Sequence, residues 1–163
     1  MLTCCWSVKG GVGTSVVAAG LALEAARTHP PVLLVDLGGD QSGVLGVQPP
    51  PVDHLDAWFG GASDVPVDAL CSLGVEVGGV RLVTGGRPGL VPDRIEVGAE
   101  RLRSSASQVV VDAGRVDGPG AEVARLLAGR ADRSLCVLRP CYLAAARAAR
   151  SPVPVTEVVL VDE

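Results

Sequence analysis

A glycine-rich segment at residues 9–15 constrains the fold of this chain more than any other feature of its sequence. The segment reads Lys-Gly-Gly-Val-Gly-Thr-Ser and lies between an apolar run at 2–8 and a helix-like stretch at 14–28. Glycines let backbone N–H groups approach an anion closely, and the positive end of the helix dipole points to the same place. A loop between a strand and a helix is the setting of a phosphate-binding loop, so we predict that residues 9–15 bind phosphate.

Apolar runs alternate with helix-like stretches along most of the chain. Residues 32–35 are continuously apolar, which is typical of a strand buried on both faces of a parallel sheet. The alternation predicts further strands at 2–8, 80–84, 108–112, 134–138 and 156–161, and helices at 14–28, 52–59, 65–73, 92–105, 119–129 and 142–150. This order predicts a Rossmann-like α/β fold of three layers, with a mostly parallel sheet flanked by helices. Because the helix at 14–28 is apolar nearly all round, we expect it to be covered on several sides.

Length and composition exclude several classes of protein. With 163 residues, of which 48% are hydrophobic, the chain is expected to form one domain. No apolar run approaches the roughly 20 residues that span a bilayer, so no transmembrane segment is predicted. The N-terminus lacks the charged lead and apolar core of a signal peptide, and we therefore expect a cytoplasmic protein.

Cysteine and charge content narrow the choice of ligands. The cysteines have no CxxC spacing and no nearby histidine, so they fit neither a disulfide framework nor a zinc site: Cys4, Cys5, Cys71, Cys136 and Cys141. The formal net charge of −4 argues against strong nucleic-acid binding. Six arginines are candidates for a local basic face, although a solvated helix surface is the commoner role of such residues: Arg94, Arg101, Arg103, Arg125, Arg130 and Arg133.

Two acidic residues come at the ends of predicted strands. Asp36 follows the strand at 32–35, and Asp112 closes the strand at 108–112. Ligands of open parallel sheets bind beyond the carboxyl ends of the strands, so both carboxylates are expected to face the glycine loop. The hydroxyl of Ser15 is expected to ligate Mg²⁺ beside a bound phosphate.

The glycine loop departs from the general motif G-x-x-x-x-G-K-[ST] at two positions. Val8 stands where the first glycine is expected, and Thr14 replaces the lysine that contacts the terminal phosphates. Losing one cationic contact weakens triphosphate binding by about 1.5–3 kcal/mol, the scale of a charge-assisted hydrogen bond. Binding survives such a loss more readily than efficient hydrolysis does. A glycine-rich turn without a ligand is the alternative interpretation.

The order K-G-G-V-G-x-[ST] resembles the deviant phosphate loop of the ParA/MinD family of P-loop ATPases, in which an extra lysine precedes the glycine pair. Lys9, the single lysine of the chain, matches that extra lysine. The resemblance implies that Lys9 reaches the nucleotide of a partner subunit in an ATP-sandwich homodimer. It also implies that the nucleotide is bound by the whole segment: Lys9, Gly10, Gly11, Val12, Gly13, Thr14 and Ser15.

The same resemblance assigns roles to the acidic residues. Asp112 resembles the Walker B aspartate, which holds Mg²⁺ through water, so Asp112 and Ser15 are the predicted magnesium-binding residues. Asp36 resembles the first acid of the family's switch segment, which positions the attacking water, so Asp36 and Lys9 are the predicted catalytic residues. The family's second acid, two residues further on, is Gly38 here. Asp40 is a weaker candidate for that role, because an aspartate between turn residues is more often a turn former.

Members of the family are ATP-driven switches that dimerise on ATP and release a membrane, DNA or protein partner after hydrolysis. The resemblance therefore implies ATP and Mg²⁺ as cofactors, slow or partner-dependent hydrolysis, and an unidentified regulatory protein. The implied process is partitioning, positioning or secretion-related cell organisation. Family members tend to continue past the final strand, so we expect a single domain, residues 1–163, shortened at its C-terminal end.

Other functions fit parts of the same sequence. The departures at Val8, Thr14 and Gly38 favour a pseudo-ATPase that acts as a protein-interaction module. Cobyrinate-amidating and dethiobiotin-forming enzymes use related loops, but no substrate pocket of theirs is identified here. An iron–sulfur carrier like the nitrogenase iron protein shares the Lys-Gly-Gly loop, but its cysteine spacing differs from that of this chain.

Overall fold

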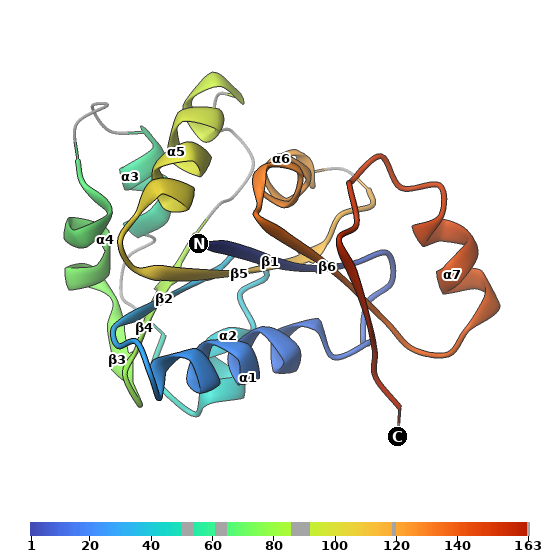
Figure 1. The fold of residues 1–163 in the computed structure, drawn as a ribbon, viewed down its shortest axis with the longest axis horizontal. Coiled ribbons are helices and arrows are strands. Elements are labelled where there is room, and N and C mark those ends of the chain that lie inside the picture. The colour runs from blue at the N-terminus through green and yellow to red at the C-terminus, as the bar shows by residue number, and fades with distance from the viewer. Residues whose placement is uncertain (50–53, 61–64, 86–91, 119, 163) are drawn as a thin grey trace.

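The computed structural model describes residues 1–49, 54–85 except 61–64, 92–118 and 120–162, and these residues form one central sheet with helices on both faces (Figure 1). The strands are β1 (Leu2–Ser7), β2 (Val32–Asp36), β3 (Val75–Val77), β4 (Val80–Thr84), β5 (Gln108–Arg115), β6 (Arg133–Leu138) and β7 (Glu157–Leu160). The helices are α1 (Thr14–Ala26), α2 (Gln41–Leu45), α3 (His54–Gly60), α4 (Val67–Leu73), α5 (Pro92–Ser104), α6 (Glu122–Arg130) and α7 (Tyr142–Ala148).

The sheet has the order β3-β4-β2-β5-β1-β6-β7, and its strands are parallel except for the pairing of β3 with β4. Alternate residues of a strand face opposite sides of the sheet. In β2, Leu33 and Val35 therefore pack into the core beneath α3, α4, α5 and α6, while Val32 and Leu34 pack against α1. The two cores confirm the predicted three-layer α/β fold, and they explain why β2 is apolar without interruption.

Helix α1 is less covered than its composition predicts. Ala18, Ala22 and Ala26 are buried against the sheet, and their small side chains allow the helix to pack closely. On the opposite side, Val16 is 64% exposed and Leu23 is 37% exposed. The expectation that this helix is covered on several sides was therefore wrong, because its one covered face is made of alanines flanked by the half-buried Val17 and Leu21.

Two short elements, β3 and α2, were missed in the sequence. β3 pairs antiparallel with β4 through the two-residue turn Gly78–Gly79, in which both glycines have positive φ angles of 57° and 83°. Such a turn matches the right-handed twist of a hairpin, so the adjacent glycines were a usable signal. Helix α2 is only five residues long and lacks an apolar stripe long enough to be seen.

Several element boundaries also differ from the prediction. Strand β5 continues three residues beyond Asp112, to Arg115, and helix α6 begins at Glu122. The predicted start of the helix at 119 and residues 52–53 of another predicted helix lie outside the described residues. None of the helices among the described residues is both long enough and apolar enough to cross a bilayer.

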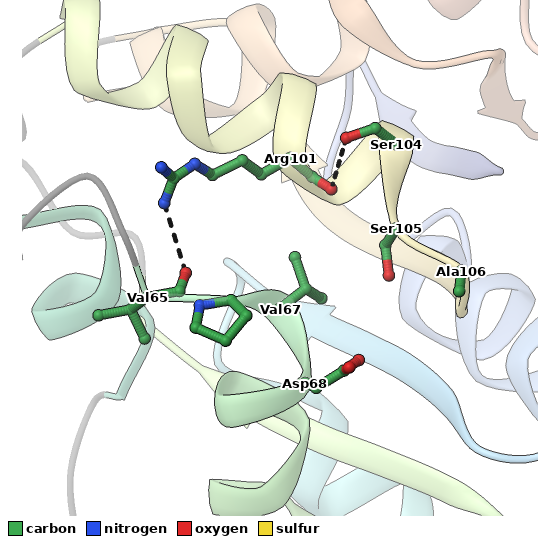
Figure 2. Close-up of a pocket in the computed structure, with 8 residues that line it drawn as sticks. Val65, Val67, Asp68, Arg101, Ser104, Ser105 and Ala106 are labelled. Carbon is green, nitrogen blue, oxygen red and sulfur yellow. Dashed lines mark hydrogen bonds between the residues drawn. The ribbon is translucent and has the colours of Figure 1, made fainter.

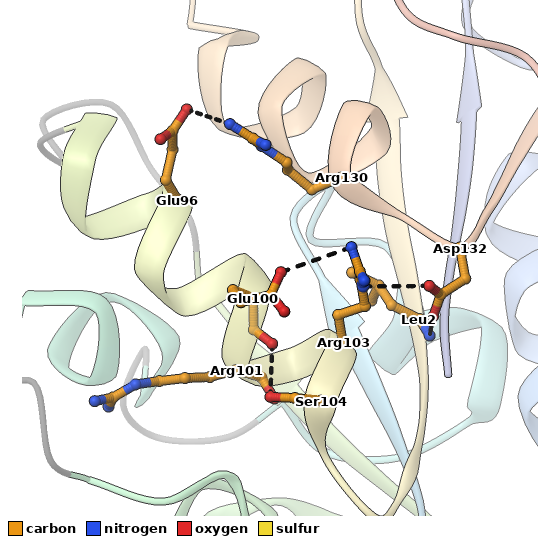
Figure 3. A network of polar contacts seen from close by, with 8 residues as sticks. All are labelled: Leu2, Glu96, Glu100, Arg101, Arg103, Ser104, Arg130 and Asp132. Atoms are coloured by element: carbon orange, nitrogen blue, oxygen red, sulfur yellow. Dashed lines mark hydrogen bonds and ion pairs between the residues drawn. The ribbon is translucent and has the colours of Figure 1, made fainter.

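A polar network closes the edge of the sheet where the parallel strands begin (Figure 3). The backbone N–H of Leu2 donates to Asp132 at 2.8 Å, and Arg103 pairs with the same carboxylate at 3.3 Å. Arg130 pairs with Glu96 at 2.9 Å and so connects α6 to α5. Among the arginines considered for a basic face, several pair with carboxylates, namely Arg103, Arg125, Arg130 and Arg133. Much of their charge is therefore neutralised locally.

Candidate nucleotide-binding site

The glycine loop connects the end of β1 to the start of α1. Gly11 has a φ angle of 71° and Gly13 one of 90°, a region in which residues with a Cβ atom are strained. Gly13 directly precedes α1, and its carbonyl oxygen accepts the N–H of Val17 at 2.9 Å as the first turn of the helix forms. The backbone of this loop therefore depends on glycine at these two positions.

A cavity of about 480 Å³ lies over the glycine loop. Its size is in the usual range of small-molecule sites, about 300–1,000 Å³. It is lined by the loop and the start of α1 (Gly10, Gly11, Gly13, Thr14 and Ser15), by the segment after β2 (Gly38 and Asp40) and by the end of β5 (Gly114 and Arg115). Five of the seven residues predicted to bind nucleotide thus line one cavity, at the carboxyl ends of the parallel strands.

The other two predicted nucleotide-binding residues do not line the cavity. The side chain of Val12 is buried in the core between α1 and the sheet. Lys9 is exposed and is not among the residues that line the cavity. Its charge, acting after the backbone N–H groups of Ala144 and Leu143, helps to lower the pKa of the Cys141 thiol. Lys9 is therefore within electrostatic range of the start of α7 and is not part of the cavity lining.

The carboxylate of Asp36 organises the segment between β2 and α2. Its Oδ1 accepts the backbone N–H groups of Gly38 at 3.0 Å and Gly39 at 2.7 Å. Its Oδ2 accepts the N–H of Gln41 at 3.0 Å, at the first residue of α2. Burial raises the pKa of Asp36, although these three donors oppose the shift. The observed contacts of Asp36 are therefore those of a loop-shaping residue, and its catalytic role stays a prediction.

Asp112 lies beside Asp36 on the neighbouring strand, since the two residues are partners in the β2–β5 register. Its side chain is fully buried. Its Oδ1 accepts the N–H of Gly114 at 3.1 Å, and its Oδ2 accepts the side-chain amide of Gln41 at 2.8 Å. The strand order thus places both predicted acids at the same edge of the sheet, next to the glycine loop.

Gln41 is a site residue that the sequence analysis did not single out. Its side chain is fully buried, and its Nε2 donates both to the carbonyl oxygen of Ser15 and to Asp112. Its Oε1 has no hydrogen-bond partner among the described residues. Gln41 therefore links α2 to the first turn of α1 and to Asp112 of β5. Glutamine is usually exposed, and Asp112 is 71 residues away in the chain, so local pattern contained no signal for this contact.

The residues around Gln41 fit a hydrated magnesium ion. Mg²⁺ takes oxygen ligands, retains several waters and usually binds through one or two carboxylates together with substrate phosphates. Ser15 would supply a hydroxyl from the cavity lining and the buried Asp112 a carboxylate from below it, and the unpartnered Oε1 of Gln41 is a buried acceptor suited to water. The described residues contain no group of three or more His, Cys, Asp or Glu side chains placed to hold a metal by themselves.

Thr14 occupies the position of the missing lysine, and its side chain is buried. The positive charge in the cavity comes from Arg115, at the end of β5. Its guanidinium pairs with Asp117 at 2.8 Å, and this pairing lowers the pKa of Asp117. Arg115 was not predicted, because the strand was expected to end at Asp112.

A second pocket lies away from this site, between the start of α4 and the end of α5 (Figure 2). It measures about 350 Å³, and the guanidinium of Arg101 points to the carbonyl oxygen of Val65 at its rim, at 3.4 Å. The pocket also borders Ser105 and Ala106, just before β5 begins. It therefore sits near the strand starts and contains none of the predicted site residues.

Comparison with known proteins identifies the fold. No protein-family model matches the chain, and no curated protein matches its sequence. The solved structures that match include MinD from Aquifex aeolicus (TM-score 0.71, 20% identity, 98% of this chain and 68% of that chain). They also include a ParA family ATPase from Chlorobium tepidum (0.74, 19%, 98% and 72%) and the MinD protein of Pyrococcus horikoshii complexed with Mg-ADP (0.67, 16%, 98% and 69%). The chain therefore has the ParA/MinD-type P-loop fold, as its sequence predicted.

Proposed function

We propose that this protein is a ParA/MinD-like nucleotide switch that binds Mg-ATP at the glycine loop and hydrolyses it slowly or with the help of a partner protein. The observation that carries the proposal is the cavity over the loop, which brings Ser15 and Arg115 together next to the buried Asp112. The fold is shared with structures that include a Mg-ADP complex. The proposed setting is the positioning or partitioning of a cellular component.

Each part of the site has a separate task in this proposal. Backbone N–H groups of the loop bind the phosphates, helped by the dipole of α1. Ser15 and Asp112 would hold Mg²⁺, Asp112 through water, and the bound ion would supply neutralisation of the phosphate charge. Asp36 shapes the segment 38–41, which places Asp40 on the wall of the cavity. We propose that this wall of the cavity positions the water molecule that attacks the terminal phosphate.

The protein is also proposed to form a homodimer when nucleotide binds. Within the described part of the chain Lys9 makes no hydrogen bond or ion pair, and it is not part of the cavity lining. An exposed ammonium group one residue before the cavity-lining Gly10 is proposed to reach the phosphates of a facing subunit. In the proposed dimer, each Lys9 thus adds a positive charge to the nucleotide site of the facing subunit.

Titration with a fluorescent ATP analogue in the presence of Mg²⁺ tests the binding site. We expect saturable binding with a Kd below about 1 mM, which corresponds to more than about 4 kcal/mol of binding free energy. Ser15→Ala should weaken binding only when Mg²⁺ is present, because it removes a metal ligand and leaves the loop backbone intact. The exposed Ser72, in α4, provides the matched control Ser72→Ala, which should bind like the wild type.

Absence of binding at near-millimolar nucleotide would favour the second candidate function, a protein-interaction module without nucleotide turnover. The observation behind that alternative is Thr14, a buried neutral side chain at the position of the motif lysine. Under that alternative the glycine loop is only a turn between β1 and α1.

A further inference from the structure

We propose that Arg115 is the phosphate-binding cation of this site and replaces the lysine that is missing at position 14. This inference rests on the proposed function, because it names the residue that binds the nucleotide phosphates. Among the described residues that line the cavity, Arg115 is the only one with a positive charge. Lys9, the nearest alternative in the sequence, is not part of the lining.

A bulge in β5 delivers Arg115 to the cavity. In the pairing of β1 with β5, Cys5 is opposite Asp112 but Trp6 is opposite Gly114, so one extra residue is inserted in β5. Gly114 has a φ angle of 59°. Since side chains alternate between the faces of a strand, a one-residue insertion redirects every residue that follows it. Bulges next to functional sites commonly re-aim a side chain in this way.

The stem of Arg115 lies over the glycine loop. A Cβ atom placed on Gly10 would be 3.7 Å from the Cδ of Arg115, which is van der Waals contact. The side chain of Arg115 and the loop glycines Gly10, Gly11 and Gly13 therefore line the same cavity. A planar guanidinium can donate two parallel hydrogen bonds to a phosphate group, which suits it to this task.

The present partner of Arg115 is easily exchanged. The ion pair with Asp117 is solvent-accessible, with side chains 54% and 36% exposed, and pairs of this kind contribute little to stability. Asp117 has a second cation nearby, since Nη1 of Arg147 is 4.0 Å from its Oδ2. Arg115 can thus turn from Asp117 to an incoming phosphate without leaving that carboxylate far from positive charge.

Nucleotide affinities of Arg115 variants test this inference. Arg115→Ala should weaken Mg-ATP binding by about ten- to hundredfold, the range of a charge-assisted hydrogen bond, and should not change the affinity for adenosine, which has no phosphate. The matched control is Arg130→Ala. Arg130 is also 54% exposed, pairs with Glu96, and lies at the opposite edge of the sheet. The control should change the Kd by less than about twofold.

Two further variants test whether the positive charge of Arg115 is what binds the phosphates. Asp117→Asn removes the competing partner and should strengthen Mg-ATP binding. Adding Thr14→Lys to Arg115→Ala should recover most of the lost affinity, because it returns a cation to the motif position. Thermal unfolding checks that every variant is folded.

The outcomes distinguish the two proposals. If Arg115→Ala binds Mg-ATP as tightly as the wild type does, the role of Arg115 is overturned and the proposed function stands. Wild-type protein that binds no Mg-ATP overturns both. A loss of affinity in Arg115→Ala, restored by Thr14→Lys, supports both.

Discussion

At the scale of single residues, the site depends on polar side chains that are buried and yet hydrogen-bonded. Asp36, Gln41 and Asp112 are each at most 1% exposed. Burying a polar group is unfavourable unless its hydrogen bonds are replaced, and in this site they are largely replaced by backbone N–H groups and by the amide of Gln41. The exception is Oε1 of Gln41, which is left as an acceptor for water.

Gln41→Leu should lower the free energy of unfolding by about 1–3 kcal/mol, because Asp112 and the carbonyl oxygen of Ser15 lose their donor in a buried place. The same change should weaken the Mg²⁺ dependence of nucleotide binding. Chemical denaturation measures the first effect, and Gln48→Leu, at an exposed position of the same segment, is the control. Equal stability of Gln41→Leu and the wild type would contradict the contacts described for this amide.

At the scale of elements, the start of α7 and the strands of the core give the cysteines very different environments. Burial raises the pKa of the Cys5 thiol to about 12 and that of Cys136 to about 11. It also raises the pKa of Cys4 and Cys71. Cys141 differs, because backbone N–H groups at the start of α7, and then Lys9 and Arg147, lower the pKa of its thiol.

Cys141 should therefore be the first thiol to react with a disulfide reagent in the native protein at pH 8, since the thiolate is the reactive form. Lys9→Ala should slow that reaction by removing a nearby positive charge. Arg27→Ala, at an exposed position beyond α1, should have no effect. Stopped-flow thiol titration, with mass spectrometry to locate the label, measures both rates; an unchanged rate in Lys9→Ala would place Lys9 away from α7.

At the scale of the whole molecule, the strand order decides what can meet. β1 lies between β5 and β6, so the glycine loop, the end of β5 and the start of α7 gather at one edge of the sheet (Figure 1). Ligands of open parallel sheets bind at this edge. The exposed Lys9 lies at the same edge and is not among the residues that line the cavity.

If Lys9 serves a second subunit, Lys9→Ala should abolish dimerisation by Mg-ATP in light-scattering experiments. The free energy of unfolding of the monomer should change by less than about 0.5 kcal/mol, because an exposed side chain is removed. Arg27→Ala is again the control and should dimerise normally. A Lys9→Ala protein that dimerises as well as the wild type would rule out this role.

The sequence by itself determined the order of the elements, the parallel core and the position of the glycine loop. These features are local. Residues 32–35 are all apolar because both faces of β2 are covered. Gly11 and Gly13 are required because their φ angles are positive. The local signal was less complete for β3 and α2, which have only three and five residues.

Tertiary structure alone decided which side chains meet in the site. Gln41 reaches Asp112 across 71 residues of sequence, and a bulge in β5 sends Arg115 over the glycine loop. Neither contact follows from periodicity, since each depends on strand order and register, which are set by packing between distant segments. The chain therefore encodes its phosphate loop locally, while the acid, amide and cation around that loop are brought together only by the folded sheet.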